Sequence, residues 1–153
     1  MHGSLDIKSN YILERVSDRP ELFLNKDPVR PELDVYFKTS MGREVFGLKN
    51  SSEEFVAFIC IGFTDHIPKD TDELDIYSDP SGHIAIAYSV WSYSRGAGRA
   101  TINCILDMAK QSERITRVVT LSPLTKMAED FHIKNGAIKL SENEKTANFE
   151  YII

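Results

Sequence analysis

The chain has few cysteines and no recurring spacing of metal-binding residues, which excludes a disulfide framework and argues against a metal centre. It carries two cysteines in 153 residues. Cys60 falls in a predicted strand and Cys104 in a predicted helix, where a buried, reduced thiol is the expected state. The four histidines share no ligand spacing with one another or with the cysteines. We therefore expect no metal site.

The chain also lacks a surplus of positive charge and a long apolar run. Its net charge is −5, whereas nonspecific binding to nucleic acid depends on an excess of Lys and Arg. The longest apolar run, Phe55–Phe63, has about half the length that a membrane-spanning helix needs. The first residues lack the basic-then-apolar layout of a signal peptide. These absences predict a cytoplasmic protein without a nucleic-acid or membrane partner.

What is present fits one ordinary domain. Hydrophobic residues make up 42% of the chain and charged residues 27%, so it can bury a core without disulfides or a metal. We expect a single domain over residues 1–153, with a poorly defined segment at 1–30. Within that segment, Tyr11–Leu13 predicts a short strand or a helix turn, and Asp18–Phe23 resembles the capped start of a short helix.

The most informative stretch, His83–Gln111, changes its hydrophobic period in the middle. Strict alternation predicts a strand with Ile84, Ile86, Tyr88 and Val90 on one face and Ala85, Ala87, Ser89 and Trp91 on the other. From Arg99 onward the apolar residues follow helical spacing, at Ile102, Ile105, Leu106 and Ala109. The stretch therefore predicts a strand, a tight loop and an amphipathic helix in succession.

The loop between the two periods has the chemistry of a phosphate site. It consists of Arg95, Gly96, Ala97, Gly98, Arg99 and Ala100. The glycines allow a tight turn that leaves the first N–H groups of the helix free, at the positive end of its dipole. The two arginines add forked donors that suit phosphate oxygens. The alternative is a glycine turn that only joins a strand to a helix.

The residues that follow the two glycines distinguish between the known kinds of glycine-rich phosphate loop. A P-loop needs Lys and Ser or Thr directly after its second glycine, where this chain has Arg99 and Ala100. The dinucleotide fingerprint fails at its third glycine, where Thr101 stands, and no carboxylate follows in Thr116–Thr125. Nucleotide hydrolysis and dinucleotide binding are thereby disfavoured.

The pattern that remains, Arg/Gln-x-x-Gly-x-Gly/Ala, is met by Arg95, Gly98 and Ala100. It resembles the pyrophosphate loop of the GNAT superfamily of N-acetyltransferases, and Val90–Ala100 is similar to that family's motif A. The loop, together with Tyr88–Trp91 before it and Phe131–Ala137 after it, also resembles small phage-type members. The resemblance implies that acetyl-CoA is the cofactor, that residues 95–100 hold its pyrophosphate, and that its pantetheine arm pairs with the strand near Ser89 and Val90.

A second motif follows. Ser122 as N-cap, Pro123 at the first helical position and Gly136 as the stop predict a helix over 123–135. Its expected core stripe consists of Leu124, Met127, Ala128 and Phe131. Residues 125–137 are similar to the family's motif B.

Two departures from motif B affect the expected mechanism. Thr125 stands where the family has a cofactor-contacting Asn, and His132 stands where it has its usual general acid, a Tyr. The resemblance makes His132 the candidate proton handler, because imidazole can exchange a proton near neutral pH. Tyr88 and Ser89 are the reserve catalytic candidates, and a partly exposed surface histidine is the alternative.

The remaining elements complete an expected order. Arg43–Lys49 and Glu54–Phe63 predict an antiparallel hairpin, and Ile115–Leu121 a strand parallel to 83–91. Residues 137–140 and 147–153 predict the last two strands. Residues 30–42 favour a helix, with a strand over Asp34–Thr39 as the alternative. This order matches an α/β (α+β) GNAT fold: a mixed central sheet with an antiparallel N-terminal hairpin, a splayed parallel pair and helices on both faces.

The connection over Thr64–Gly82 is strongly acidic. It carries Asp65, Asp70, Asp72, Glu73, Asp75 and Asp79 against Lys69. Long connections in small domains are often binding loops. The segment is either a solvated acidic loop or a lid that attracts a cationic amine.

Two functional hypotheses follow. The first is an acetyl-CoA-dependent N-acetyltransferase in which a primary amine, on a small molecule or a protein, attacks the thioester directly. The alternative is a catalytically weak or inactive GNAT-fold module that binds CoA or contacts another protein. A monomer or a homodimer fits either hypothesis.

Overall fold

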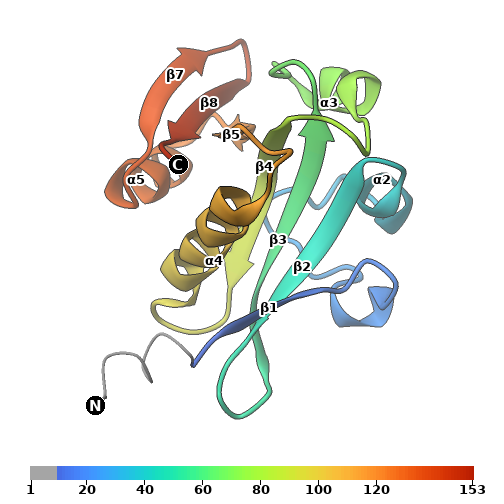
Figure 1. The fold of residues 1–153 in the computed structure, drawn as a ribbon, viewed down its shortest axis with the longest axis vertical. Coiled ribbons are helices and arrows are strands. Elements are labelled where there is room, and N and C mark those ends of the chain that lie inside the picture. Colours follow the sequence, from blue (N-terminus) through green and yellow to red (C-terminus); the bar gives the residue numbers. More distant parts are fainter. Residues whose placement is uncertain (1–9) are drawn as a thin grey trace.

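The computed structural model describes residues 10–153, which form one mixed sheet flanked by helices (Figure 1). The sheet has eight strands in the order β1-β2-β3-β4-β5-β8-β6, and β7 pairs with β8. The strands are β1 (Ile12–Arg15), β2 (Arg43–Lys49), β3 (Phe55–Thr64), β4 (Ile84–Ser92), β5 (Arg117–Thr120), β6 (Ser122–Pro123), β7 (Ile138–Glu142) and β8 (Thr146–Tyr151). The helices are η1 (Pro20–Leu22), α2 (Val35–Thr39), α3 (Thr71–Tyr77), α4 (Ala97–Gln111) and α5 (Lys126–Lys134).

The strand pairing confirms the predicted topology. β2 and β3 form the expected antiparallel hairpin. β4 and β5 run parallel, with Ile84 opposite Arg117 and Ala87 opposite Thr120. α4 makes the crossover between them, as a parallel pair requires. β7 and β8 form the closing hairpin.

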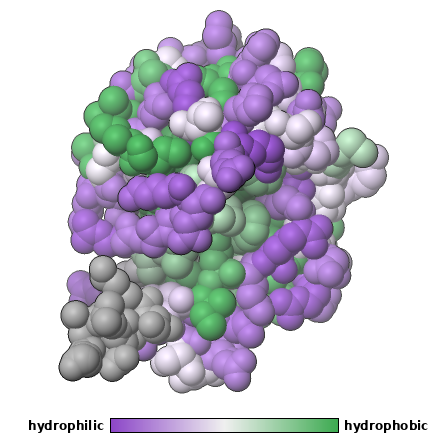
Figure 2. Space-filling model, in the orientation of Figure 1, coloured by the Kyte–Doolittle hydropathy of each residue, from purple (hydrophilic) through white to green (hydrophobic). Residues whose placement is uncertain are grey.

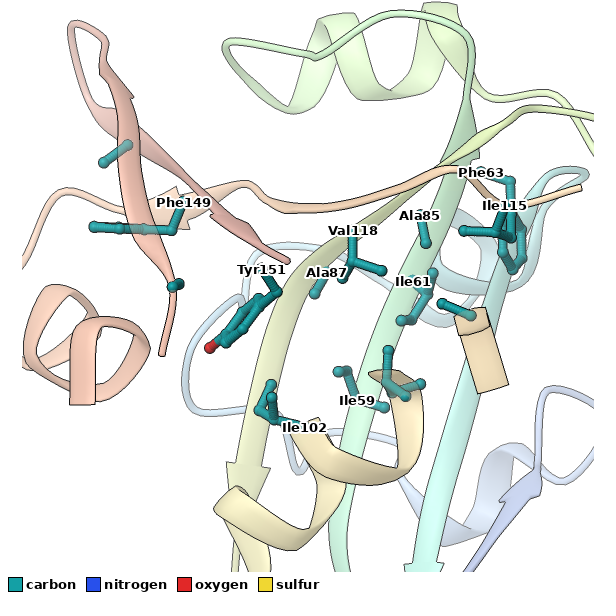
Figure 3. Packing of buried hydrophobic residues seen from close by; sticks show 14 residues of the cluster. Ile59, Ile61, Phe63, Ala85, Ala87, Ile102, Ile115, Val118, Phe149 and Tyr151 are labelled. Atoms are coloured by element: carbon teal, nitrogen blue, oxygen red, sulfur yellow. The ribbon is translucent and has the colours of Figure 1, made fainter. Parts of the chain in front are cut away.

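Hydrophobic cores lie on both faces of the sheet. On one face, Ile59 and Ile61 of β3 and Ala85 and Ala87 of β4 pack with Ile102 of α4 (Figure 3). On the other face, Phe58, Ile86 and Tyr88 pack with Phe23 and with side chains around α2. Because both faces are covered, β3 is apolar along nearly its whole length.

A β-bulge in β4 changes which side chains share a face. Cys60 of β3 lies opposite Ser89, but the next residue, Ile61, lies opposite Ala87, so Tyr88 is the extra residue. One additional residue shifts the alternation by one position. Trp91 therefore joins the core of Tyr88, and Val90 packs on the opposite core. The predicted strict alternation from Ile84 to Trp91 is wrong beyond this bulge.

The segment before β2 contains a short helix rather than a strand. Asp34 caps α2 by accepting a hydrogen bond from the N–H of Phe37 at 2.8 Å. β1 pairs with β2, which resolves the Tyr11–Leu13 alternative as a strand.

The helix α5 begins later than predicted. Ser122 and Pro123 form β6, with Ser122 opposite Ala147 of β8. Thr125 is the N-cap instead, and its Oγ1 accepts from the N–H of Ala128 at 3.2 Å. Strand pairing at the end of the sheet thus overrides a good local capping sequence. The predicted stop is confirmed by the left-handed φ of +101° at Gly136.

The predicted core stripe of α5 is also wrong in part. Met127 is 83% exposed, and Leu124 lies before the helix with 44% of its surface exposed. His132 is the buried residue of this helix. Leu124 leaves the stripe because the helix starts after it, and Met127 because it lies on the wall of the cavity described below.

The acidic connection is folded around α3. Asp70 caps this helix by accepting from the N–H of Glu73 at 2.8 Å, and Asp75 pairs with Arg43 at 2.8 Å. Leu74 is completely buried. Within residues 10–153, no helix is long and apolar enough to cross a membrane.

The strand β7 forms an edge of the sheet and carries apolar side chains. It pairs with β8 alone in the described chain. Ile138 and Leu140 are exposed there, and Figure 2 shows hydrophobic surface in this region. An exposed edge can pair with another chain, but the prediction of a monomer or homodimer stays a prediction.

Candidate functional site

The parallel strands β4 and β5 part after a short paired region. Their pairing ends where Ala87 lies opposite Thr120, and the N–H of Leu121 donates to the carbonyl of Ala87 at 2.9 Å. Beyond this point β4 continues beside β3, whereas the chain after β5 turns to pair with β8. Within the part of the chain that the structure describes, residues 88–92 of β4 therefore have a strand on one side only. Figure 1 shows α5, β7 and β8 diverging from the long strands.

A cavity of about 500 Å³ occupies this split. Its walls are mainly apolar and come from β4, the N-terminal turn of α4, β6, α5 and the segment before α2. Six of the predicted site residues line it: Tyr88, Ser89, Val90, Gly98, Thr125 and His132. The fold thus brings motif A and motif B together at one cavity.

The glycine loop begins α4 in the predicted manner. Gly96 is the N-cap, and its φ of +82° lies in the left-handed region that favours glycine. Ala97 donates to the carbonyl of Ser94 and Ala100 to that of Gly96. Among residues 10–153, no acceptor takes the N–H of Gly98 or Arg99, so these two donors remain available at the positive end of the helix.

The two arginines of the loop are exposed, at positions 95 and 99. Neither forms an ion pair with another residue of the described range, 10–153. Their charges therefore remain available to an anion.

Gly98 also has a packing role. A Cβ atom at this position would lie 3.0 Å from the ring of Phe131, which is tighter than normal contact. The missing side chain lets α5 approach the first turn of α4. Replacement of Gly98 would therefore disturb the helix packing as well as any ligand.

His132 is buried at the inner wall of the cavity. It is 6% exposed, and its Nδ1 lies 2.7 Å from the hydroxyl of Tyr151. Its ring stacks on Phe149 at a centroid distance of 5.5 Å. Burial lowers the pKa of His132 to about 4, so the imidazole is neutral at physiological pH. The expectation of a partly exposed surface histidine is wrong.

Tyr151 is a site residue that the sequence did not indicate. Its hydroxyl reaches His132 from β8, and burial raises the pKa of Tyr151 above its ordinary value. The pairing fixes one ring nitrogen of His132 and leaves Nε2 as the other hydrogen-bonding atom. Because its partner is 19 residues away along the chain, no local motif could reveal the contact.

Tyr88 and Ser89 direct their hydroxyls into the protein. The Tyr88 hydroxyl is buried, without a hydrogen-bond partner among residues 10–153, and its ring packs edge-on against Phe37. Burial raises the pKa of Tyr88 well above its ordinary value. Ser89 donates to the carboxylate of Asp27, with distances of 2.7 and 2.8 Å to the two oxygens.

A buried ion pair behind the cavity was also not predicted from the sequence. Asp27 pairs with Lys38 at 2.9 Å, and their side chains are 2% and 6% exposed. Burial alone would raise the pKa of Asp27, but hydrogen bonds from Lys38, the Arg30 N–H and Ser89 outweigh it and lower that pKa. Arg30 is buried beside this pair. Ser89, Tyr88 and Leu121, which they contact, lie far away along the chain, so no spacing pattern marks Asp27 or Arg30.

The side-chain oxygen of Thr125 caps α5. The residue still lines the cavity, whereas a contact to a cofactor stays a prediction.

Comparison of the sequence with family models finds no match, and a search of curated proteins finds none either. Solved structures do match. The GNAT-like decarboxylase GphF, in complex with isobutyryl-CoA, has a TM-score of 0.70 at 12% identity, over 92% of this chain and 98% of that one. The loading GNATL domain of CurA from Lyngbya majuscula has a TM-score of 0.67 at 16% identity, over 92% and 96%.

Malonyl-CoA decarboxylase from Agrobacterium vitis has a TM-score of 0.63 at 18% identity, over 82% of this chain. The present chain spans only about a third of that enzyme, 36% of its length. Other matches are acetyltransferases. At these identities the likeness concerns the fold, and it agrees with the mixed sheet, the parallel pair of β4 and β5 and the flanking helices. The chain has the GNAT fold.

Proposed function

We propose that this chain is an acyl-CoA-dependent acyltransferase that transfers an acetyl group to a primary amine of a small molecule or a protein. The observation that carries the proposal is the cavity between β4 and α5, which ends at a helix N-terminus with available N–H groups. An anionic cofactor with a long apolar arm suits this combination.

The residues present fit CoA. The N–H groups of Gly98 and Arg99, together with the guanidinium groups of Arg95 and Arg99, would hold the pyrophosphate. The edge of β4 near Val90 would pair with the amides of the pantetheine arm, as a further strand would. The thioester supplies an activated acyl carbonyl when the cofactor is bound.

The chain itself would contribute mainly proximity and charge stabilisation. Holding an amine beside a thioester removes much of the entropic barrier, and a backbone N–H of β4 would stabilise the developing oxyanion. His132 is the proposed proton handler. Being neutral before the reaction, it would take the proton that the amine loses as the C–N bond forms, and would pass it to the CoA thiolate as the C–S bond breaks.

A decarboxylase is the second candidate function. Among residues 10–153, none of those that line the cavity carries a carboxylate that could deprotonate an amine. A reaction that needs no such base, such as loss of CO₂ from a malonyl thioester, agrees with this lining. GphF and the Agrobacterium vitis enzyme are described as decarboxylases.

One experiment separates the candidates. The purified protein is incubated with acetyl-CoA and a panel of amines, and separately with malonyl-CoA alone, while free thiol, CO₂ and acyl product are measured. Amine-dependent thiol release supports the acyltransferase, and CO₂ release with the thioester intact supports the decarboxylase. If CoA binds but neither reaction occurs, the inactive GNAT-fold module is the correct description.

His132→Ala tests the proton handler in the same assay. Loss of a general base lowers kcat by about a hundredfold, while CoA binding at the loop is retained. His66→Ala is the control, since that residue is absent from the cavity lining. An unchanged kcat and pH profile would remove His132 from the mechanism.

A further inference from the structure

Arg30 bridges the two strands where they part. Its Nε donates to the carbonyl of Tyr88 on β4 at 3.2 Å, and its Nη2 donates to the carbonyl of Leu121, directly after β5, at 2.9 Å. The side chain is 10% exposed. One guanidinium thus satisfies two carbonyls on opposite sides of the split.

These two carbonyls lie just beyond the last bond of the parallel pair, from the N–H of Leu121 to the carbonyl of Ala87. Buried carbonyls need hydrogen-bond donors. A guanidinium presents its N–H groups in a rigid plane, so the positions of both acceptors are set relative to each other. Lys could not reproduce this geometry, because its ammonium is a single point donor.

The position of Arg30 is fixed from its own backbone. The carboxylate of Asp27 accepts from the N–H of Val29 at 2.8 Å and of Arg30 at 3.0 Å. The same carboxylate accepts from Ser89 of β4 and pairs with Lys38 of α2. The turn that carries Arg30 is therefore attached to the residue that follows Tyr88.

We propose that Arg30 is a positioning residue that fixes the separation of β4 and β5 where they part. In doing so it places the backbone of residues 88–90 against a thioester bound in the split. Arg30 does not line the cavity, so it acts through the strands. The catalytic consequence rests on the proposed function, whereas the structural bridge does not.

The test compares Arg30→Lys with Arg43→Lys. Arg43 is a matched control because it is also buried, donates to the Phe37 carbonyl and the Ser78 hydroxyl, and pairs with Asp75. It lies outside the cavity lining. Both variants keep the positive charge and replace a buried guanidinium with an ammonium group. A general loss of stability would therefore appear in both.

Hydrogen exchange tests the bridge without any substrate. Exchange of the Leu121 amide should be about tenfold faster or more in Arg30→Lys, because the last bond of the parallel pair loses its support. The amide of Val45, on β2, serves as the internal reference. Equal exchange at Leu121 in the two variants would overturn the bridge.

Kinetics test the catalytic part. In Arg30→Lys, kcat should fall by about a hundredfold, as expected for a displacement of the reacting atoms by about 1 Å, while affinity for CoA is retained at the loop. Arg43→Lys should retain kcat. A wild-type protein that binds no CoA would overturn the proposed function and leave the exchange result standing. A normal kcat in Arg30→Lys with normal CoA binding would overturn the positioning role alone.

The wild-type protein offers an independent measurement should Arg30→Lys fail to fold. The Nε–H of Arg30 should give a slowly exchanging NMR signal, because it is bonded to a buried carbonyl. A signal that exchanges as fast as those of exposed arginines would contradict the bridge.

Discussion

Replacement of Arg95 tests whether the loop at the start of α4 binds the phosphates of CoA. Arg95 is exposed directly before the left-handed Gly96, so its replacement should leave the fold intact. In calorimetry, Arg95→Ala should weaken CoA binding about tenfold or more, because a lost charge-assisted contact is worth about 1.5 to 3 kcal/mol. Lys110→Ala is the matched control, since it removes the same charge from the other end of α4. Equal affinities in the two variants would mean that the loop does not hold the phosphates.

The lowered pKa of His132 predicts that the free energy of unfolding depends on pH. The pKa of His132 is about 4 in the folded protein, against an ordinary value of 6.5. As pH falls from 6.5 towards 4, the unfolded state binds a proton and the folded state does not. The folded state should therefore lose up to about 3 kcal/mol in this window, with full stability above it.

Chemical denaturation at a series of pH values measures this loss, and His132→Gln should flatten the dependence. The lowered pKa of Asp27 acts at lower pH, because its ordinary value is 3.8, so the two effects separate. A dependence that persists unchanged in His132→Gln would assign it to other groups.

At the scale of elements, α3 shows how the acidic connection is held. Leu74 is fully buried and fills the space above Gly62, where a Cβ atom would lie 2.8 Å from a methyl group of Leu74. The connection could open as a lid only by exposing this side chain. None of its residues lines the cavity, and its role as a lid stays a prediction.

A double-mutant cycle tests this anchoring. Leu74→Ala should destabilise the protein by about 2 to 5 kcal/mol, because it leaves a cavity. Gly62→Ala should destabilise the parent through the close contact, yet be neutral or stabilising in Leu74→Ala, where the space is free. Additive changes in the free energy of unfolding would show that Leu74 does not pack against Gly62.

Most of the helices and strands could be predicted from the sequence, but some of their boundaries could not. The strands β2 to β5 and the helix α4 followed from hydrophobic period, which reflects the face that each element buries. The parallel direction of β4 and β5 followed from their order, a strand, a helix and a strand. The start of α5 could not be predicted, because Ser122 and Pro123 have good capping chemistry but pair with β8 instead. The bulge at Tyr88 was equally invisible, since it depends on register with β3.

The candidate site was predictable only where a local motif carries it. Gly96 and Gly98 follow each other closely along the chain, and the structure places them at the start of α4 as expected. Arg30 and Tyr151 act through partners on distant strands. Periodicity and spacing contain no information about such contacts, so these residues appear only in the folded chain.

For the whole molecule, the split between β4 and β5 divides the sheet into two parts. Besides the short parallel pair and Arg30, Asn148 of β8 joins them by donating to the carbonyl of Pro68, in the connection between β3 and β4, at 3.0 Å. A ligand in the split would contact β4 on one side and α5 on the other. The proposed function therefore requires that CoA binds there, along β4 and against the first turn of α4.

A direct test of CoA binding in the split is an NMR titration of the isotopically labelled protein with CoA. We predict saturable shifts of the backbone amides of residues 96–100 and of residues 89–92 on β4, with the β1–β2 pair unchanged as the internal control. The Arg95→Ala variant should show the same shifts at higher CoA concentration. Shifts that do not saturate, or that lie outside both segments, would contradict a CoA site in the split.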